Sequence, residues 1–325
     1  MSASAAATSA AGNPLLVVGA LGIVYVVWGS TYLAIRVTAR HLPAMASACW
    51  RYFAAAVILA CILALRSGWR RLRTGRRELL GCAALGLLLP AMGNGVVVVG
   101  EQMGAPSGLT ALLIAAVPLW VVVYRSSAGD RPNRRTFTGV ALGFAGLVGL
   151  IAASGIGGDV RVKACLVVVA ASVSWSFGSW STPRLTLPHD PFVVTVYEML
   201  FGSGFLLIGA LIRREDVVPG GGSLDSWLAW AYLVTFGSVL AFTAYVWVLQ
   251  AAPISLVATY AYVNPVVAVF LGWLILGESV TPAIIAGGGV VVASVAIVVS
   301  AERRTPSRDQ QPRRGSELLE ATDTA

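Results

Sequence analysis

Long apolar runs, separated by short polar or basic stretches, follow one another along almost the whole chain. Such runs are typical of transmembrane helices, because about 20 helical residues span the hydrocarbon core of a bilayer. Prolines, glycines and clusters of charge divide the pattern into ten of them. The expected spans are residues 14–35, 44–65, 79–100, 105–124, 136–153, 163–182, 191–212, 227–249, 253–276 and 281–300. The pattern therefore predicts an all-α membrane protein with ten transmembrane helices.

The two halves of the chain share a motif. Pro106 and Pro253 each open an apolar run, and a second proline follows twelve residues later, at Pro118 and Pro265. Five spans per half is an odd number, so the second copy must be inverted in the bilayer relative to the first. The expected parts are a disordered cytoplasmic tail (1–13), a first five-helix repeat (14–153), an external connector (154–162), a second five-helix repeat (163–300) and a second disordered cytoplasmic tail (301–325).

The distribution of Lys and Arg predicts the orientation. Of the 23 basic residues, 16 lie in the tails and in the loops after even-numbered spans, and 6 lie on the opposite side. The positive-inside rule then places both termini in the cytoplasm. This topology accounts for the net charge of +8 without a nucleic-acid partner, since no basic patch is interleaved with exposed aromatic residues.

Two charges lie deep within expected spans, Arg51 in the second and Glu198 in the seventh, at nearly equivalent positions of the two repeats. A charge at such depth is costly and is usually paired or functional. Inversion of the repeats leaves the two at different heights, so we favour separate roles over a direct ion pair. Arg51 is then a snorkelling anchor or a contact for an anionic substrate, and Glu198 a proton or cation site; a satisfied structural charge is the alternative for each. Glu101 and Glu278 lie at span ends, where nearness to water makes burial inexpensive.

Aromatic and small polar residues within the spans are candidates for a substrate cavity: Trp28, Thr31, Tyr32, Asn94, Trp175, Ser179, Tyr245, Tyr262 and Asn264. An amide in hydrocarbon needs a hydrogen-bond partner, and a tryptophan can equally belong to an interfacial belt. Pro118 and Pro265 each remove a backbone donor, so we expect kinked or broken helices there, facing protein or a cavity.

Enzymatic signatures are missing from the sequence. It has no P-loop, no HExxH and no aspartate-rich prenyl-diphosphate motif, and its two histidines lie at span boundaries. Ser203, between two glycines, resembles part of an intramembrane protease signature, but no histidine is placed to act as its base. The four cysteines have neither CxxC nor Cys/His spacing. We therefore expect no catalytic residue, no metal and no cofactor.

Three segments carry a resemblance to a known family: WGSTYLAIR in the first span, Pro43 with Arg51 in the second, and NPVVAVFLGWLILGESVTPAIIAGGGVVVASV in the last two. Over roughly residues 14–300 the chain resembles the EamA-like drug/metabolite transporters. In the first half, Asp130-Arg131 occupies the place of the family's glutamate.

The resemblance implies a multi-pass secondary carrier of the inner (plasma) membrane, usually an exporter of amino acids, related metabolites or drugs. We expect alternating access around a site near the midplane, between the two halves. An uncoupled facilitator or channel is the alternative, and a membrane-embedded enzyme is a third reading. The expected partners are a small-molecule substrate and the lipid bilayer, with the protein a monomer or a homodimer.

Overall fold

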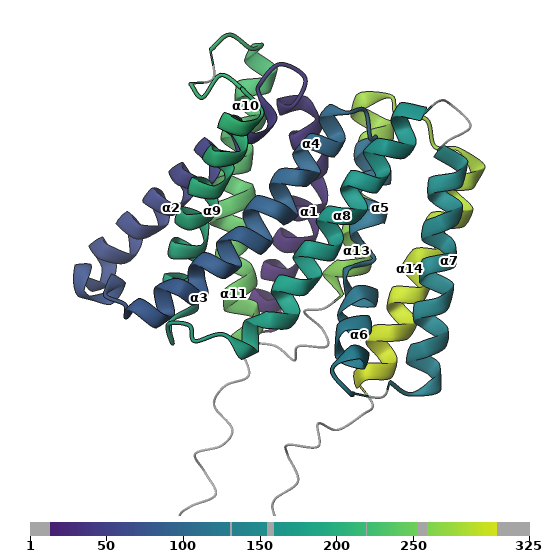
Figure 1. Cartoon of the computed structure of the whole chain (residues 1–325), viewed down its shortest axis with the longest axis horizontal. Coiled ribbons are helices and arrows are strands. Elements are labelled where there is room, and N and C mark those ends of the chain that lie inside the picture. Colours follow the sequence, from purple (N-terminus) through teal and green to yellow (C-terminus); the bar gives the residue numbers. More distant parts are fainter. Residues whose placement is uncertain (1–13, 131, 155–158, 219, 252–258, 304–325) are drawn as a thin grey trace, which may run out of the picture.

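The computed structural model describes residues 14–130, 132–154, 159–218, 220–251 and 259–303, and all regular secondary structure in these ranges is helical (Figure 1). The first half contains α1 (Pro14–Thr38), α2 (Ala44–Ser67), η1 (Trp69–Leu72), α3 (Arg76–Gly86), η2 (Leu87–Gly95), α4 (Val96–Gln102), α5 (Ser107–Ile114), α6 (Val117–Ser127) and α7 (Arg134–Ser154). The second half contains α8 (Asp159–Ser181), η4 (Thr182–Arg184), α9 (Pro191–Ile212), α10 (Leu224–Tyr232), η5 (Leu233–Leu240), α11 (Ala241–Ala251), α13 (Tyr260–Leu276) and α14 (Pro282–Arg303).

Nine helical runs within the described ranges are long and apolar enough to cross a membrane. Three of them are composite: α3, η2 and α4 form one run, α5 and α6 a second, and α10, η5 and the start of α11 a third. The helix α13 has 17 residues, and residues 253–258 of the expected ninth span lie outside the description. The all-helical membrane fold is thus confirmed, whereas the count of ten spans stays a prediction.

Some boundaries differ from those expected. The helix α8 begins at Asp159, inside the stretch 154–162 expected as a connector. The helix α14 continues to Arg303, so the first residues of the expected C-terminal tail are helical. The tail residues 1–13 and 304–325 lie outside the described ranges. A helix can extend beyond an apolar run where no proline or glycine ends it. Bounds that are set from the apolar residues alone therefore miss such extensions.

The two expected helix breaks have different outcomes. The helix is interrupted between α5 and α6, and Pro118 lies in the first turn of α6, where its missing N–H is not needed. Pro265 lies inside α13, which continues through it, so the helix is not broken there and a kink stays a prediction. Close packing supports the helix at this point: a Cβ added to Gly29 of α1 would lie 2.7 Å from Val267 of α13.

Carboxylates hold the first turns of the two repeat-equivalent helices α2 and α9. Glu215 accepts hydrogen bonds from the N–H groups of Met45 and Ala46, at 2.8 and 3.0 Å. Asp190 accepts from the N–H of Phe192 at 3.0 Å. These oxygens satisfy donors that the helix itself leaves unpaired, and they suit its positive end. The N-terminus of each of these two helices is therefore capped by a carboxylate.

The two halves of the chain interlock. The most extensive helix contacts are made by two repeat-equivalent pairs, α2 with α9 and α7 with α14, and the latter pair lies side by side in Figure 1. Each large buried cluster draws on both halves: Leu119 packs in the same core as Val295, and Tyr52 in the same core as Leu206. Because the cores are shared, neither half forms a separate bundle.

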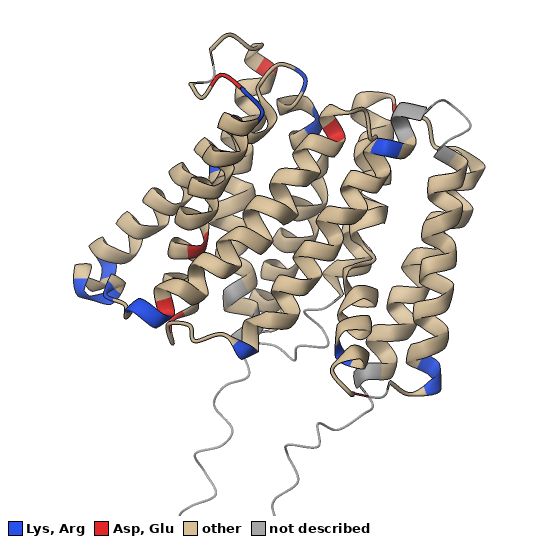
Figure 2. Ribbon diagram, viewed as in Figure 1, with Lys and Arg blue, Asp and Glu red and all other residues tan. Residues whose placement is uncertain are grey.

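Charged residues gather at the two ends of the helical body, and its middle is almost free of them (Figure 2). Large apolar side chains cover much of the outside, with Leu65 88% exposed and Ile212 76% exposed. A surface of this kind suits lipid rather than water. The four cysteines all lie in the described ranges and form no disulfide there, and Cys61 is exposed.

Candidate functional site

Two π-helical segments occupy corresponding places in the two halves. The segment η2 contains Pro90 and interrupts the third span, and η5 interrupts the eighth. Shifted by the 147 residues that separate Pro118 from Pro265, η2 falls on residues 234–242, which overlap η5. Short π-helical segments often occur at functional sites, because their loosened backbone frees polar groups for other contacts. Nothing in the sequence pattern indicated η5, which contains no proline.

The guanidinium of Arg51 joins these two segments. Arg51 is only 5% exposed, and its Nε donates to Oγ of Ser238 in η5 at 3.1 Å. Its Nη1 donates to Oδ1 of Asn94 in η2 at 3.2 Å. The guanidinium carbon lies 4.9 Å from the ring centre of Tyr52. We call Arg51, Asn94, Gly237 and Ser238 the arginine site.

No carboxylate among the described residues lies within 4.0 Å of the Arg51 guanidinium. Glu198, in the middle of α9, is buried at 8% exposure and makes no hydrogen bond in the described part of the chain. The ring of Tyr52 lies within electrostatic range of both charges. Arg51 and Glu198 therefore do not form an ion pair.

An aromatic cluster adjoins the arginine site. The indole of Trp28 lies 4.9 Å from the ring of Tyr245 and 5.4 Å from that of Tyr260, between ring centres. Phe242 packs on both Trp28 and Tyr245 at 6.2 Å. We call Trp28, Phe242, Tyr245 and Tyr260 the aromatic wall. Its rings come from α1, α11 and α13, and they are all half-buried.

Gly237 connects the aromatic wall to the arginine site. Its carbonyl accepts the indole N–H of Trp28 at 3.3 Å. A Cβ at this position would lie 3.1 Å from Cγ2 of Thr31 and 3.7 Å from Nη2 of Arg51. The carbonyl of Gly237 thus binds Trp28, and the lack of a side chain at Gly237 lets Thr31 and Arg51 lie close to it. The structure brings together four residues expected at the cavity, namely Trp28, Thr31, Asn94 and Tyr245.

The other expected cavity residues lie elsewhere. Trp175 packs against Gly93 of η2, and Ser179 donates to the carbonyl of Trp175 in its own helix at 2.9 Å. Tyr262 packs on the hydrophobic cluster around α5 and α14. Asn264 is buried, and its side-chain oxygen has no hydrogen-bond partner among the residues that the structure describes. Tyr32 lies near the end of α1, within electrostatic range of Glu101.

A second polar group lies where α4 ends and α5 begins. Glu278 follows α13, yet its carboxylate accepts from the N–H groups of Ser107 and Gly108, at 2.8 and 3.1 Å. Gly277, with a left-handed φ of 64°, turns the chain so that Glu278 reaches α5. Glu101, expected near water, is instead 0% exposed, because α1 and the α4–α5 turn cover this helix end. The sequence signal was present, an acid directly after five apolar residues, but its burial depends on tertiary contacts.

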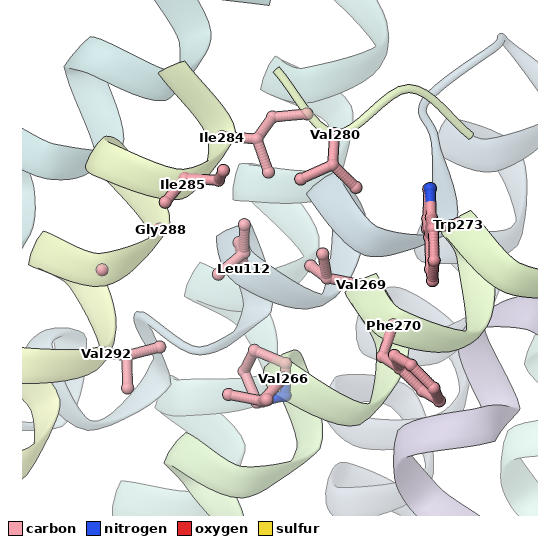
Figure 3. Close-up of a pocket in the computed structure, with 12 residues that line it drawn as sticks. Leu112, Val266, Val269, Phe270, Trp273, Val280, Ile284, Ile285, Gly288 and Val292 are labelled. Carbon is pink, nitrogen blue, oxygen red and sulfur yellow. The ribbon is translucent and has the colours of Figure 1, made fainter. Parts of the chain in front are cut away.

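A cavity of about 510 Å³ lies between α5, α13 and α14 (Figure 3). Figure 3 shows Leu112, Val266 and Ile284 directed toward it, with Trp273 at its edge. Its lining is almost wholly apolar, and Phe270 and Trp273 are themselves exposed on the outer surface. It offers no group that would orient a polar solute, so we do not place the functional site there. No group of three or more His, Cys, Asp or Glu side chains that could hold a metal is found in the described residues.

A bundle of apolar helices that holds a buried arginine and an aromatic wall, both built from the two halves of the chain, is compatible with a membrane transporter. The model of the EamA-like transporter family matches the chain twice, over residues 15–152 and 162–300. The chain belongs to the EamA-like transporter family, and it is a transporter rather than an enzyme.

Curated relatives agree with this assignment. The chain is 35% identical to the "Uncharacterized inner membrane transporter YedA" of Escherichia coli, covering 89% of this chain and 92% of the relative. It is 27% identical to the "Probable terminal-alkyne amino-acid exporter" of Streptantibioticus cattleyicolor, over 90% and 96% of the two chains. A crystal structure of a protein 22% identical in sequence covers 88% of this chain and 98% of its own, with a TM-score of 0.58. That likeness concerns the fold.

Proposed function

We propose that the protein is a secondary transporter of the inner membrane that exports amino acids or related small carboxylates by alternating access. The relative of Escherichia coli, named an inner membrane transporter, supports the location. The relative of Streptantibioticus cattleyicolor, named a probable amino-acid exporter, supports the substrate class. The fold supports a carrier built from two similar halves with shared cores. The geometry around Arg51 supports the substrate class.

The observation that carries the proposal is the uncompensated charge of Arg51. Burying a cation costs several kcal/mol, as an order of magnitude, unless an anion repays it. Asn94 and Ser238 supply only neutral acceptors to Nη1 and Nε. A substrate carboxylate would supply the missing charge, and its two oxygens match the planar fork of a guanidinium. Nη2, beside Gly237, has no hydrogen bond within the described chain and is the nitrogen left for it.

The aromatic wall would hold the remainder of the substrate. Its rings present apolar faces and, through the tyrosines, hydroxyl groups. Gly237 leaves room between Thr31 and Arg51 that any side chain at this position would fill. A solute with a carboxylate at one end and an apolar or weakly polar group at the other fits this arrangement.

Inverted repeats of five spans each, with both termini in the cytoplasm, complete the proposal. Contact between equivalent helices, α2 with α9 and α7 with α14, is what an axis of pseudo-symmetry in the membrane plane would produce. The excess of Lys and Arg on the side of the termini supports the orientation. Rocking of the halves about the arginine site would open it to each side in turn.

Counterflow in proteoliposomes tests the substrate class. We expect a panel of amino acids to accelerate one another's exchange, and the matching amines, which lack only the carboxylate, to be inactive. Arg51→Gln should lower amino-acid exchange by about 10- to 150-fold, the equivalent of a hydrogen bond to a charged group. Arg66→Gln is the matched control, because Arg66 lies exposed in the last turn of the same helix.

Three outcomes would contradict the proposal. Equal exchange of amines and amino acids would remove the carboxylate contact, as would normal exchange by Arg51→Gln. Flux that neither saturates nor shows counterflow would indicate the alternative function, an uncoupled facilitator or channel.

A further inference from the structure

Two carboxyl groups lie within electrostatic range of each other at the outer end, by which we mean the C-terminal ends of α1, α4 and α13 and the start of α5. Glu278 comes from the second half of the chain, and Glu101 from the first. Glu278 accepts two N–H groups at the N-terminus of α5, a position that favours a negative charge. Glu101 is the next-to-last residue of α4, at the end of a helix where a negative charge is disfavoured.

The positive charge of Arg36 is the one contribution among the described groups that favours an ionised Glu101, and burial of the carboxyl group opposes it. Glu101 is 0% exposed, and no described residue forms a hydrogen bond with Oε1 or Oε2. Arg36 of α1 reaches this turn, but its Nη1 donates to the backbone carbonyl of Glu101 rather than to the carboxyl group. A dry ionised carboxylate without donors is so costly that the neutral, protonated form is the one compatible with this arrangement.

The hydroxyl groups nearby are an independent sign that a partner is missing. Ser107 and Thr110 lie one turn apart on α5, both 0% exposed, and their hydroxyl oxygens make no hydrogen bond with any described residue. Buried polar groups are nearly always paired, so three unpaired side chains at one helix junction call for a functional reason. A group that binds and releases a proton as the junction opens and closes meets this need.

The charged and titratable groups around Glu101 come from each element packed against it. They are Arg36 and Tyr32 of α1, Glu278 after α13, the exposed Lys163 of α8, and Arg213 after α9, which donates to Gln102 at 3.3 Å. None of them makes a hydrogen bond or ion pair with the Glu101 carboxyl group. Glu278 is a second acidic group within electrostatic range, and a negative charge on it opposes ionisation of Glu101.

We propose that Glu101 is a proton-binding site on the external side, and that the outer end closes only when a proton from the external solution neutralises this carboxyl group. The proposal rests on the alternating access proposed above. As the outer end opens, water reaches Glu101, the O–H bond breaks and the proton leaves to the solution. As it closes, a proton from the same side is taken up. Glu198 is a poorer candidate, because it lies in the middle of α9, where the backbone packs against Gly86 of α3, rather than at the outer end.

Cysteine accessibility tests this without any substrate, so its result is separate from that of the amino-acid proposal. Ala105 lies between α4 and α5 and is 0% exposed, so Ala105→Cys reports opening of the outer end. The native cysteines Cys49, Cys61, Cys82 and Cys165 are replaced by alanine. Right-side-out vesicles are labelled with an impermeant maleimide while the external pH is varied. Labelling is divided by that of Arg40→Cys, an exposed position after α1, which removes the intrinsic pH dependence of the thiol.

We expect the normalised labelling of Ala105→Cys to rise with external pH, by at most about tenfold per pH unit, the limit for one linked proton. Adding Glu101→Gln should abolish this dependence and keep labelling low, because the amide is neutral at every pH. Adding Glu198→Gln, the matched control, should leave the dependence intact.

A flat profile without the Glu101 substitution would overturn the proposal, and so would an unchanged profile with Glu101→Gln. A response to internal pH alone, or to sodium at constant external pH, would also overturn it. If Glu101→Gln does not fold, the labelling of Ala105→Cys as a function of external pH and of sodium still tests the proposal.

Discussion

Replacing Glu278 by glutamine removes a charge that joins the two halves of the transporter. The carboxylate accepts two N–H groups of α5, and an amide retains one oxygen, so at least one of these bonds is lost. A hydrogen bond to a charged group contributes about 1.5–3 kcal/mol, and the favourable position at the helix N-terminus is lost as well. Ser107 is fully buried, so water does not replace the missing acceptor while the outer end is closed.

We therefore expect Glu278→Gln to weaken the closed outer end by about 2–3 kcal/mol, a shift of about 30- to 150-fold toward the open form. Labelling of Ala105→Cys from outside, at constant pH, measures this shift. The control is Asp130→Asn, because Asp130 occupies the corresponding place in the first half. It pairs with Arg125 at 2.5 Å, with both side chains more than a third exposed. Such a surface pair contributes about 0–1 kcal/mol.

The reasoning fails if Glu278→Gln leaves labelling unchanged, since the contact would then not hold the outer end closed. It fails equally if Asp130→Asn increases labelling as much as Glu278→Gln does, because the effect would then come from general loosening of the bundle.

Three further changes have expected results. Trp28→Phe keeps a ring in the aromatic wall but loses the hydrogen bond to the Gly237 carbonyl, which contributes about 1 kcal/mol. The half-saturating substrate concentration should therefore rise about fivefold, and unchanged counterflow kinetics would show that Trp28 is not part of the substrate site. Gly277→Ala places a side chain at a φ of 64° and should lower the free energy of unfolding by about 1 kcal/mol, measured by thermal unfolding in detergent. An unchanged unfolding temperature would show that the backbone is not strained by a side chain at this position. Asp190→Ala removes both the N-terminal cap of α9 and the ion-pair partner of Arg71 at 2.5 Å. The free energy of unfolding should fall by about 1 kcal/mol, and by less in high salt, which screens the ion pair. An equal loss at all salt concentrations would mean that only the cap contributes to stability.

Local patterns predicted much of the fold because the bilayer restricts the choices. Apolar runs bounded by prolines and charges gave helices close to the expected bounds, as α2 and α9 show. The interruption at Pro118 followed from the missing N–H. At Pro265 the helix continues, because α1 packs closely against α13 there. Proline changes the local cost of a helix, and the neighbouring helices decide whether that cost is met.

The arginine site was only half predictable. Arg51, Asn94 and Trp28 stood out as polar or aromatic residues in apolar runs, whereas Ser238 and Gly237 carried no such signal. Their role depends on the π-helical course of η5, which directs a hydroxyl and a carbonyl to residues about 190–210 positions away in the chain.

The order of residues alone determined that the chain is a membrane-embedded helical protein with two similar halves, because hydrocarbon admits few structures other than helices with paired backbones. It also marked Arg51 and Glu198 as costly charges, since depth in a span is readable from the neighbours along the chain. Only the tertiary structure decided that these two charges do not pair, that Glu278 caps a helix of the other half, and that Glu101 is dry. Those facts depend on which helix faces which, and contacts between residues more than a hundred positions apart leave no periodic trace in a single sequence.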